Sequence, residues 1–326
     1  MCTCIACRHP GLFFGRNMDL DYAFGQRVMI TPRGYLLHGK TEDWRTRYAM
    51  IGIGAAEAGW PLYAEAVNEK GLCMAGLNFP GNAVYGASAA GLRNLAPYEL
   101  ISFVLGQCGT VSQARRVLAD VNLISAPFRQ DLPLPTLHWM LADGSGCLVL
   151  EPLAGGLQIY ENPIEVLANN PPFPYHLENL KNYRNLTADY PPSRFSAGLP
   201  LEACGVGLGG LGLPGDASSA SRFVRAAFLR WNQDCPQEPA AAVSQVFHIL
   251  DAVAMVRGSV RTADGNWDMT TYACCMDAER GIYYYKTYEN SRLQAVSLGK
   301  ENLDGTELVC YALENTQQVH WVNKGE

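Results

Sequence analysis

The start of the chain offers a nucleophile. It reads Met1-Cys2-Thr3, and aminopeptidases remove an initiator methionine that precedes a residue as small as cysteine. The freed Cys2 would carry a thiol, whose ordinary pKa is about 8.5, and an α-amine with a pKa of about 7.7–8.0. Because this amine can accept the thiol proton near neutral pH, it can activate its own side chain for attack. Taken alone, however, a cysteine at position 2 is more often an accident of the start.

The residues that follow Cys2 predict a β-hairpin. Two apolar or β-tolerant runs, 2–8 and 12–17, flank His9-Pro10-Gly11, which is a turn signal. With a loop of two or three residues, position 2 falls opposite position 17 or 18. The Cβ atoms of directly opposed residues lie about 4.5–5.5 Å apart. The end of the second run is therefore expected to return to Cys2.

Two charged side chains in Gly15-Arg16-Asn17-Met18-Asp19 would then lie beside the thiol. An arginine near a thiol favours the thiolate, because an opposite charge stabilises the ionised form. A carboxylate near an α-ammonium can orient it by a charge-assisted hydrogen bond. Cys2, Arg16 and Asp19 are therefore candidate catalytic residues. The alternative is an ordinary surface ion pair between Arg16 and Asp19 at a strand end.

Composition limits the classes to which this protein can belong. The 326 residues are 48% hydrophobic and 17% charged, which is enough to bury a sizeable core. The net charge is −6, and no Lys/Arg run is typical of a nucleic-acid-binding stripe. No stretch has the ~18 apolar residues of a membrane helix, and the start lacks the pattern of a signal peptide. Eleven scattered cysteines, an odd number, indicate free thiols in a reducing cytoplasm. We expect a cytoplasmic protein with neither nucleic-acid nor membrane partners.

Strand patterns, then helix patterns, then strand patterns follow one another along the chain. This order argues for a layered α+β fold rather than for repeated βαβ units. Since no linker or internal repeat is visible, we expect one domain over residues 1–326, with an irregular segment at 122–136. Besides the hairpin, strands are expected at 27–30, 48–54, 62–66, 72–77, 137–142, 147–152, 157–160, 271–276, 281–287, 293–297 and 308–312, and helices at 97–105, 110–121, 175–184, 221–232 and 240–255.

Two motifs suggest ligands that their surroundings do not support. Residues 205–210 fit the dinucleotide pattern GxGxxG, but no strong strand precedes them and Pro214 follows where a helix should run. A flexible loop is the better interpretation. In Cys2-x-Cys4-x2-Cys7, two cysteines share one face of the strand and the third faces away. No second Cys/His cluster has zinc-finger spacing. We therefore expect neither a metal nor a nucleotide cofactor.

Residues 216–225 are a stronger candidate for a functional segment. Aspartate and serine at its start are good helix caps, and Arg222 and Arg225 stand at i and i+3 on one helical face. A solvated basic face is the alternative interpretation. Several apolar side chains crowd the same short segment, however, so at least one of the two arginines is expected near buried surface.

Six motifs along the chain form a specific set. They are Met1-Cys2-Thr3, Gly15-Arg16-Asn17-Met18-Asp19, Asn68-Glu69-Lys70-Gly71, Gly76-Leu77-Asn78-Phe79-Pro80, Leu137-His138-Trp139 and Ser221-Arg222-Phe223-Val224-Arg225. With these motifs, nearly the whole chain resembles the choloylglycine hydrolases, N-terminal-nucleophile amidases that comprise bile salt hydrolases and penicillin V acylases. The resemblance implies a four-layer αββα sandwich, in which two stacked antiparallel sheets are flanked by helices. It also implies a homotetramer and no cofactor.

The resemblance also implies roles for residues near the start of the chain. Cys2 matches the nucleophile of the family, and its freed amine matches the base. Asp19 matches the carboxylate that holds this amine, and Arg16 matches the guanidinium beside the thiol. These roles agree with the chemistry expected from the hairpin alone.

Three later residues match the rest of the family's site. Asn169 matches the oxyanion-hole amide, the backbone amide of Asn78 matches the second donor, and Arg222 matches the remaining arginine. Acyl transfer needs such donors where the tetrahedral oxygen becomes negative, and losing one typically costs about 10²–10³ in rate. Two departures stand nearby. Ala168 occupies a position where the family usually has Thr, and Cys4 replaces a usual Gly.

The predicted substrate follows from the same resemblance. Asn at position 78 resembles the bile-salt branch, whereas Tyr is more typical of penicillin V acylases. We predict hydrolysis of glycine- or taurine-conjugated bile acids through a thioester. The alternatives are a penicillin V acylase or another N-acyl amidase or acyltransferase on the same fold, and a non-catalytic amphiphile-binding protein. The apolar positions that match the steroid pocket, each of which could equally be core, are Met18, Phe128, Leu132 and Leu137.

Overall fold

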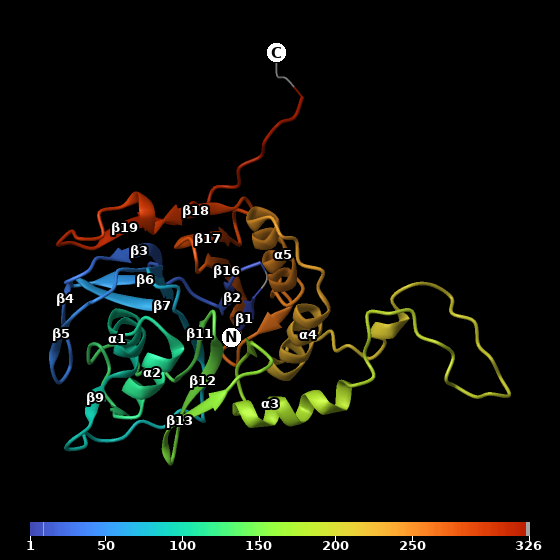
Figure 1. Cartoon of the computed structure of the whole chain (residues 1–326), viewed down its shortest axis with the longest axis horizontal. Helices are drawn as coiled ribbons and strands as arrows, with labels where there is room; N and C mark the ends of the chain where they lie inside the picture. Colours follow the sequence, from blue (N-terminus) through green and yellow to red (C-terminus); the bar gives the residue numbers. More distant parts are fainter. Residues whose placement is uncertain (9, 324–326) are drawn as a thin grey trace.

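Two large antiparallel sheets dominate the computed structural model, which describes residues 1–8 and 10–323 (Figure 1). The seven-stranded sheet has the order β14 (Val166–Leu167), β1 (Cys2–Cys7), β2 (Phe13–Leu20), β16 (Trp267–Asp277), β17 (Ile282–Thr287) and β18 (Gln294–Ser297), with β15 (Val260–Arg261) beside β16. The eight-stranded sheet has the order β13 (Gly156–Glu161), β12 (Gly146–Leu153), β11 (Leu137–Asp143), β8 (Cys73–Asn78), β7 (Trp60–Asn68), β6 (Met50–Glu57), β3 (Arg27–Thr31) and β19 (Val309–Ala312).

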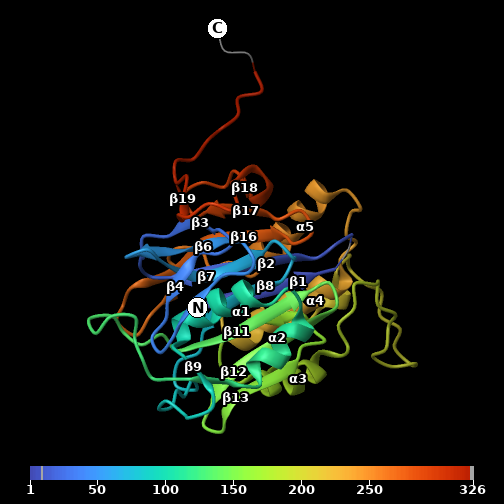
Figure 2. The same ribbon diagram turned by 60° about the vertical axis from the view of Figure 1, so that its left-hand side comes forward.

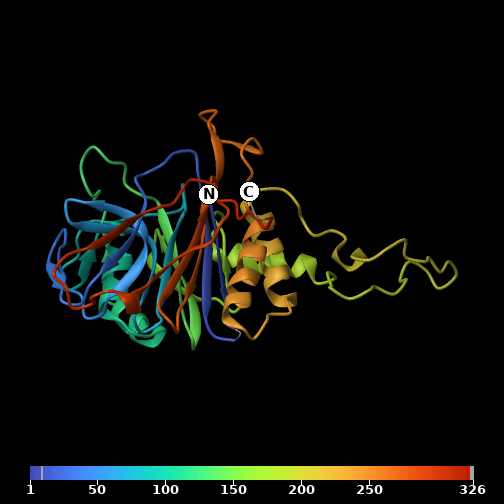
Figure 3. The same ribbon diagram turned by 90° about the horizontal axis from the view of Figure 1, so that it is seen from above.

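Helices cover the outer face of each sheet. The helices α1 (Leu100–Gln107) and α2 (Val111–Leu118) lie in front of the eight-stranded sheet in Figure 2. The helices α3 (Phe173–Leu180), α4 (Ser219–Asn232) and α5 (Pro239–Asp251) lie on the other side of the molecule, beyond the seven-stranded sheet (Figure 3). The layers therefore run helix, sheet, sheet, helix, which confirms the predicted αββα sandwich.

Smaller elements complete the structure. A parallel pair joins β9 (Arg93–Leu95) to β10 (Val121–Leu123), and an antiparallel pair joins β4 (Leu36–His38) to β5 (Asp43–Arg45). The 3-10 helices are η1 (Pro97–Glu99), η2 (Lys181–Tyr183), η3 (Leu208–Gly210) and η4 (Leu298–Lys300).

Side-chain alternation explains how one strand serves two cores. Successive residues of a strand point to opposite faces of its sheet. In β6, Met50 packs in the cluster under α1 and α2, whereas Ile51 and Ile53 pack in the cluster that contains residues of both sheets. In β8, Met74 likewise packs in the cluster under α1 and α2, and Ala75 packs in the cluster that contains residues of both sheets. Because both faces are buried, these strands read as nearly continuous apolar runs, and that is the signal from which the sequence predicted them.

Most predicted elements are confirmed within a few residues. The hairpin pairs Cys2 with Met18, in the expected register, although its turn includes His9, which lies outside the described residues. The expected helix 240–255 ends earlier, at Asp251, and the expected strand 271–276 is longer, since β16 spans Trp267–Asp277. The short strands β4, β5, β9, β10, β14 and β15 were not predicted, because two or three residues carry too little periodicity.

A long segment between η2 and α4 projects from the body of the molecule, at the right of Figures 1 and 3. We call residues 184–218 the arm. Its apolar side chains include Phe195, Val206 and Leu211, which are 76%, 92% and 82% exposed. The GxGxxG pattern lies in the arm with only a 3-10 turn, so it is a loop, as its surroundings indicated.

No helix within residues 1–8 and 10–323 is both long and apolar enough to span a membrane.

Candidate active site

The hairpin of β1 and β2 places Cys2 at the layer between the two sheets. Cys2 is opposite Met18, and Cys4 is opposite Arg16, so these four side chains share one face of the hairpin. Cys2 is 3% exposed. Its Sγ accepts a hydrogen bond from Arg16 Nη2 at 2.7 Å and lies 3.9 Å from Met18 Sδ. The predicted proximity of Arg16 to the thiol is therefore present in the structure.

Arg16 reaches across to the eight-stranded sheet, where it meets Glu65 of β7. Its Nη1 donates to Glu65 Oε2 at 2.8 Å and to the carbonyl oxygens of Ala64 and Gly76 at 3.2 and 3.1 Å. Burial alone would lower the pKa of Arg16, but the charges of Cys2 and Glu65 hold it well above its ordinary value. Glu65 was missed from sequence. The available signal was a single acidic residue within an apolar strand, since a fully buried carboxylate requires a partner.

Arg222 approaches Cys2 from the opposite side, on α4. The helix begins where Ser218 accepts a hydrogen bond from the Ser221 N–H at 3.4 Å, which is the predicted serine cap. Arg222 Nη1 donates to the Cys2 carbonyl and to Thr3 Oγ1, both at 2.5 Å. Burial lowers the pKa of Arg222, and the charge of a nearby aspartate partly opposes this effect. One of the two arginines on this helix is thus buried, as predicted.

That aspartate is Asp19, which is buried on the same side of the hairpin. Its Oδ1 accepts from Thr270 Oγ1 at 2.6 Å, and its Oδ2 lies 4.0 Å from Arg222 Nη1. Burial raises the pKa of Asp19, while the charges of Arg222 and of the chain terminus lower it. The Met1 ammonium donates to the Asp19 carbonyl oxygen and lies 3.3 Å from Asp268 Oδ2. Asp19 therefore stands close to the terminal amine of the unprocessed chain.

Asn169 follows β14 and links Cys2 to the other sheet. Its Oδ1 accepts from the Cys2 N–H at 2.8 Å and from Arg222 Nη2 at 2.7 Å. Its Nδ2 donates to the Asn78 carbonyl at 2.7 Å. The backbone is held as well, because the Asn169 N–H donates to Ser219 Oγ at 2.8 Å and its carbonyl accepts from His176 Nε2 at 3.0 Å. The side chain is thus fixed on both of its polar ends.

Asn78 ends β8, and its backbone N–H and C=O point away from β11. The pair Asn78 and Leu137 alternates with the pair Phe79 and Thr136, in which the Phe79 N–H donates to the Thr136 carbonyl at 2.8 Å. In an antiparallel ladder, the N–H and C=O of the intervening residue both point away from the partner strand. Since the Asn78 carbonyl meets Asn169, the Asn78 N–H points to the same side.

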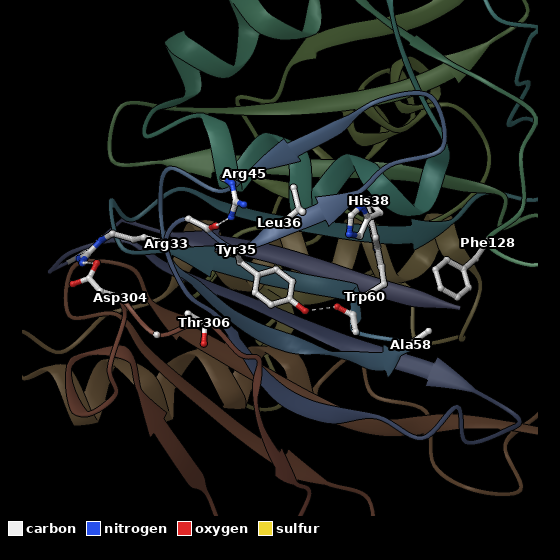
Figure 4. Close-up of a pocket in the computed structure, with 13 residues that line it drawn as sticks. Arg33, Tyr35, Leu36, His38, Arg45, Ala58, Trp60, Phe128, Asp304 and Thr306 are labelled. Carbon is white, nitrogen blue, oxygen red and sulfur yellow. Dashed lines mark hydrogen bonds and ion pairs between the residues drawn. The ribbon is translucent and has the colours of Figure 1, made fainter.

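The four apolar residues assigned to a substrate pocket are not gathered in one place by the contacts described. Met18 contacts the Cys2 sulfur, and Leu137 pairs with Asn78. Phe128 instead packs edge to face on Tyr98, with ring centroids 5.2 Å apart. It lines a surface cavity of about 570 Å³ that also includes Tyr35 and Trp60 (Figure 4). Leu132 is 36% exposed.

The two departures from the family pattern are both buried. Ala168 is fully buried, and its carbonyl accepts from His138 Nε2 at 2.9 Å, so the backbone before Asn169 is held without a hydroxyl at this position. Cys4 is also fully buried, and burial raises its pKa well above the ordinary value, although a neighbouring arginine opposes this. Cys4 therefore remains a neutral thiol beside the site.

The structure thus brings Cys2, Arg16, Asp19, Asn169 and Arg222 into one buried cluster, with the backbone of Asn78 at its edge. A thiol beside a cation, with amide groups fixed nearby, is suited to attack on a carbonyl carbon. Within the described part of the chain, no group of three or more His, Cys, Asp or Glu side chains is placed to hold a metal ion.

Similarity to known proteins agrees with this chemistry. The chain is 45% identical to a bile salt hydrolase/transferase from Lactiplantibacillus plantarum, over 99% of this chain and 100% of the relative. A crystal structure of the C2A mutant of conjugated bile acid hydrolase from Clostridium perfringens superposes with a TM-score of 0.92 at 37% identity, covering 99% of this chain and 100% of the other. Penicillin V acylase from Agrobacterium tumefaciens, at 20% identity and a TM-score of 0.76 over 97% and 94% of the two chains, shares the fold.

A family model also matches most of the chain. It describes linear amide C–N hydrolases of the choloylglycine hydrolase family, and it matches residues 2–311. The match includes every residue of the buried cluster around Cys2. The chain therefore belongs to the choloylglycine hydrolase family.

Proposed function

We propose that this protein hydrolyses the amide bond of glycine- or taurine-conjugated bile acids, with Cys2 as the nucleophile after removal of Met1. The observation that carries the proposal is the buried Cys2 sulfur, 2.7 Å from Arg16 Nη2, in a chain 45% identical to a bile salt hydrolase/transferase. The relatives supply the substrate class, and the geometry around Cys2 supplies the chemistry.

The first half of the proposed reaction forms a thioester. The Cys2 amine takes the thiol proton, and the sulfur attacks the amide carbonyl carbon. The carbonyl oxygen becomes negative and accepts hydrogen bonds from the Asn78 N–H and from the Asn169 side-chain amide. The Cys2 ammonium then gives its proton to the leaving nitrogen, and glycine or taurine departs.

The second half releases the bile acid. Water gives a proton to the Cys2 amine and attacks the thioester carbon, with the same two donors stabilising the oxygen. The thiolate leaves and recovers the proton. If another amine replaces water, the product is a new amide, so acyl transfer uses the same intermediate.

The remaining charged residues position the amine and the sulfur. Asp19 is proposed to hold the ammonium through its carboxylate, which lies on the side of Cys2 where the Met1 amine now sits. Arg222 holds the Cys2 carbonyl and Asn169 Oδ1, which aims the Asn169 amide hydrogens away from itself. Arg16 keeps its guanidinium against the sulfur.

The sterol body is proposed to bind apolar surface near the nucleophile. Met18 and Leu137 stand beside Cys2 and Asn78, and Phe128 and Leu132 belong to the loop before β11. An apolar site with a few polar anchors suits such a ligand.

A hydrolysis panel tests the function. We expect purified protein to release glycine or taurine from glycocholate and taurocholate faster than it cleaves the side-chain amide of penicillin V. Cys2→Ala should abolish turnover, and intact mass should show loss of Met1. Turnover of penicillin V alone would contradict the substrate class. An active protein that retains Met1 would contradict the terminal-amine mechanism.

We also propose that residues 1–326 act as one domain in a cytoplasmic homotetramer. The exposed apolar side chains of the arm support assembly, since such surface on one chain is normally covered by another. Light scattering after size-exclusion chromatography tests this. The mass of a single chain would contradict the tetramer.

A further inference from the structure

A carboxylate lies in the apolar layer between the two sheets. Glu65 of β7 is fully buried, and its neighbours across the sheet are Ile53 of β6 and Ala75 of β8. Both neighbours belong to the core cluster shared by the two sheets. A charge in such a place requires hydrogen bonds and an opposite charge. The partners of Glu65 therefore indicate why an acid is present.

Three side chains of the opposite sheet supply these hydrogen bonds and the opposite charge to Glu65. Tyr283 donates to Oε1 at 2.5 Å, and Tyr272 lies 3.1 and 3.0 Å from Oε1 and Oε2. Arg16 donates to Oε2 at 2.8 Å. Burial, with the charge of Glu65 acting in the same direction, raises the pKa of both tyrosines well above the ordinary value. Both tyrosines therefore remain hydroxyl donors.

This arrangement fixes the guanidinium of Arg16 in one orientation. One end, Nη1, is held by Glu65 and by the carbonyls of Ala64 and Gly76. Because the guanidinium is planar and rigid, the other end, Nη2, must then face the Cys2 sulfur.

The charge of the pair also matters during the reaction. In the proposed reaction the sulfur passes from a thiol to a thiolate on attack and then to an uncharged thioester in the intermediate. A buried arginine without a fixed counter-charge would stabilise only the thiolate. With Glu65 beside it, Arg16 is compensated in all three states.

We propose that Glu65 is a positioning residue for the reaction at Cys2, which holds Arg16 against the sulfur and compensates its charge while the sulfur changes charge. This inference rests on the proposed function for its role in turnover, but its effect on the sulfur does not depend on the substrate. The other titratable groups that face Cys2, Arg16 or Glu65 are Cys4, Tyr22, Arg222 and Cys274. Asp19 and Asp268 face Arg222 instead.

The test separates charge from position with two variants. Glu65→Gln keeps the size of the side chain but removes its charge, and Glu65→Asp keeps the charge but shortens the reach. Iodoacetamide modification of Cys2 is followed across pH by mass spectrometry of the N-terminal peptide. In Glu65→Gln, the midpoint of modification should fall by at least one pH unit, because uncompensated Arg16 favours the thiolate. In Glu65→Asp, it should stay within about 0.3 unit of wild type.

Turnover of glycocholate provides the second measurement. Both variants should lose at least tenfold in kcat with KM changed less than twofold, since Glu65 touches no substrate. Glu99→Gln is the matched control, because Glu99 is equally buried but bonds to backbone amides of Ala96 and Lys40. This control should change neither the midpoint nor kcat.

The outcomes are distinguishable. A Glu65→Gln midpoint equal to wild type would overturn the charge role. Unchanged kcat in folded Glu65→Asp would overturn the positioning role, even if Glu65→Gln does not fold. If wild type cleaves no conjugated bile acid, the proposed function fails, but the modification profiles still decide whether Glu65 controls Cys2.

Discussion

Two fully buried arginines touch Cys2 from opposite sides, and they are held differently. Arg16 lies between the sheets, where Glu65 is 2.8 Å away. Arg222 lies on the side of α4, where its close partners are neutral oxygen atoms of Cys2, Thr3 and Asn169. The carboxylate nearest to Arg222 is 4.0 Å away, on Asp19.

The two arginines differ in how completely their positive charge is compensated. Arg16 has a permanent counter-charge, and the charges around it keep its pKa well above the ordinary value. Burial instead lowers the pKa of Arg222, because its surroundings compensate its charge less completely. We therefore expect Arg222 to interact more strongly with negative charge that forms during the proposed reaction.

Removal of Arg16 should cost more stability than removal of Arg222. Arg16→Met leaves Glu65 buried without its opposite charge, which typically costs about 3–5 kcal/mol in the free energy of unfolding. Adding Glu65→Gln should restore part of this loss, because the orphaned charge is then removed as well. Urea denaturation of the single and double variants measures both effects. A double variant less stable than Arg16→Met would contradict the ion-pair interpretation.

Removal of Arg222 should act mainly on turnover. Arg222→Met loses the hydrogen bonds that hold the Cys2 carbonyl and Asn169, so we expect a fall of about 10²–10³ in kcat/KM, in the range of a lost oxyanion donor. Arg225→Met is the matched control on the same helix. Arg225 bonds to the carbonyls of Ala252 and Pro214, so its loss should change kcat/KM less than threefold. Equal losses in the two variants would remove Arg222 from the site.

The Tyr283 hydroxyl, which bonds to Glu65, should contribute more to the free energy of unfolding than the Tyr285 hydroxyl on the same strand. Tyr283→Phe removes a 2.5 Å hydrogen bond to the carboxylate, which typically contributes about 1.5–3 kcal/mol. Tyr285→Phe removes a bond from the Glu314 N–H at 3.2 Å, for which about 0.5–1.5 kcal/mol is typical. Thermal or urea unfolding compares the two. If Tyr285→Phe proves the more costly, the bond from Tyr283 to Glu65 is not the stronger of the two.

The stability of the protein should also depend slightly on pH through His176, which bonds to the same asparagine as Arg222. Burial lowers the pKa of His176 from its ordinary value near 6.5. Below pH 6.5 the unfolded chain binds a proton that the folded protein resists, so stability should fall as pH decreases, by at most about 1.4 kcal/mol per pH unit. His176→Gln can still donate to the Asn169 carbonyl but cannot titrate. Between pH 7 and pH 5 its stability should therefore fall less than that of wild type. Identical slopes would mean that His176 is charged in both states or in neither.

Local parts of the site were predictable, and distant parts were not. The register of the hairpin followed from a short turn between two apolar runs, and the cap of α4 followed from the serines before Arg222. The supporting residues Ser219, His176 and Thr270 were missed, because a polar residue in a helix or strand does not reveal which distant group it meets. The chemical roles of Asn78 and Asn169 came only from the family resemblance.

The residue pattern of the first hairpin is enough to predict that Cys2, Arg16 and Asp19 lie together, because neighbouring strands of a short hairpin have one favourable register. The local pattern also predicts a capped helix that carries Arg222 among apolar neighbours. The contact of Glu65 with Arg16, and the bonds by which Asn169 joins Cys2 to Asn78, are visible only in the folded chain. These contacts join the two sheets and segments far apart in the chain. They depend on how the two sheets stack, which a local pattern of residues does not specify.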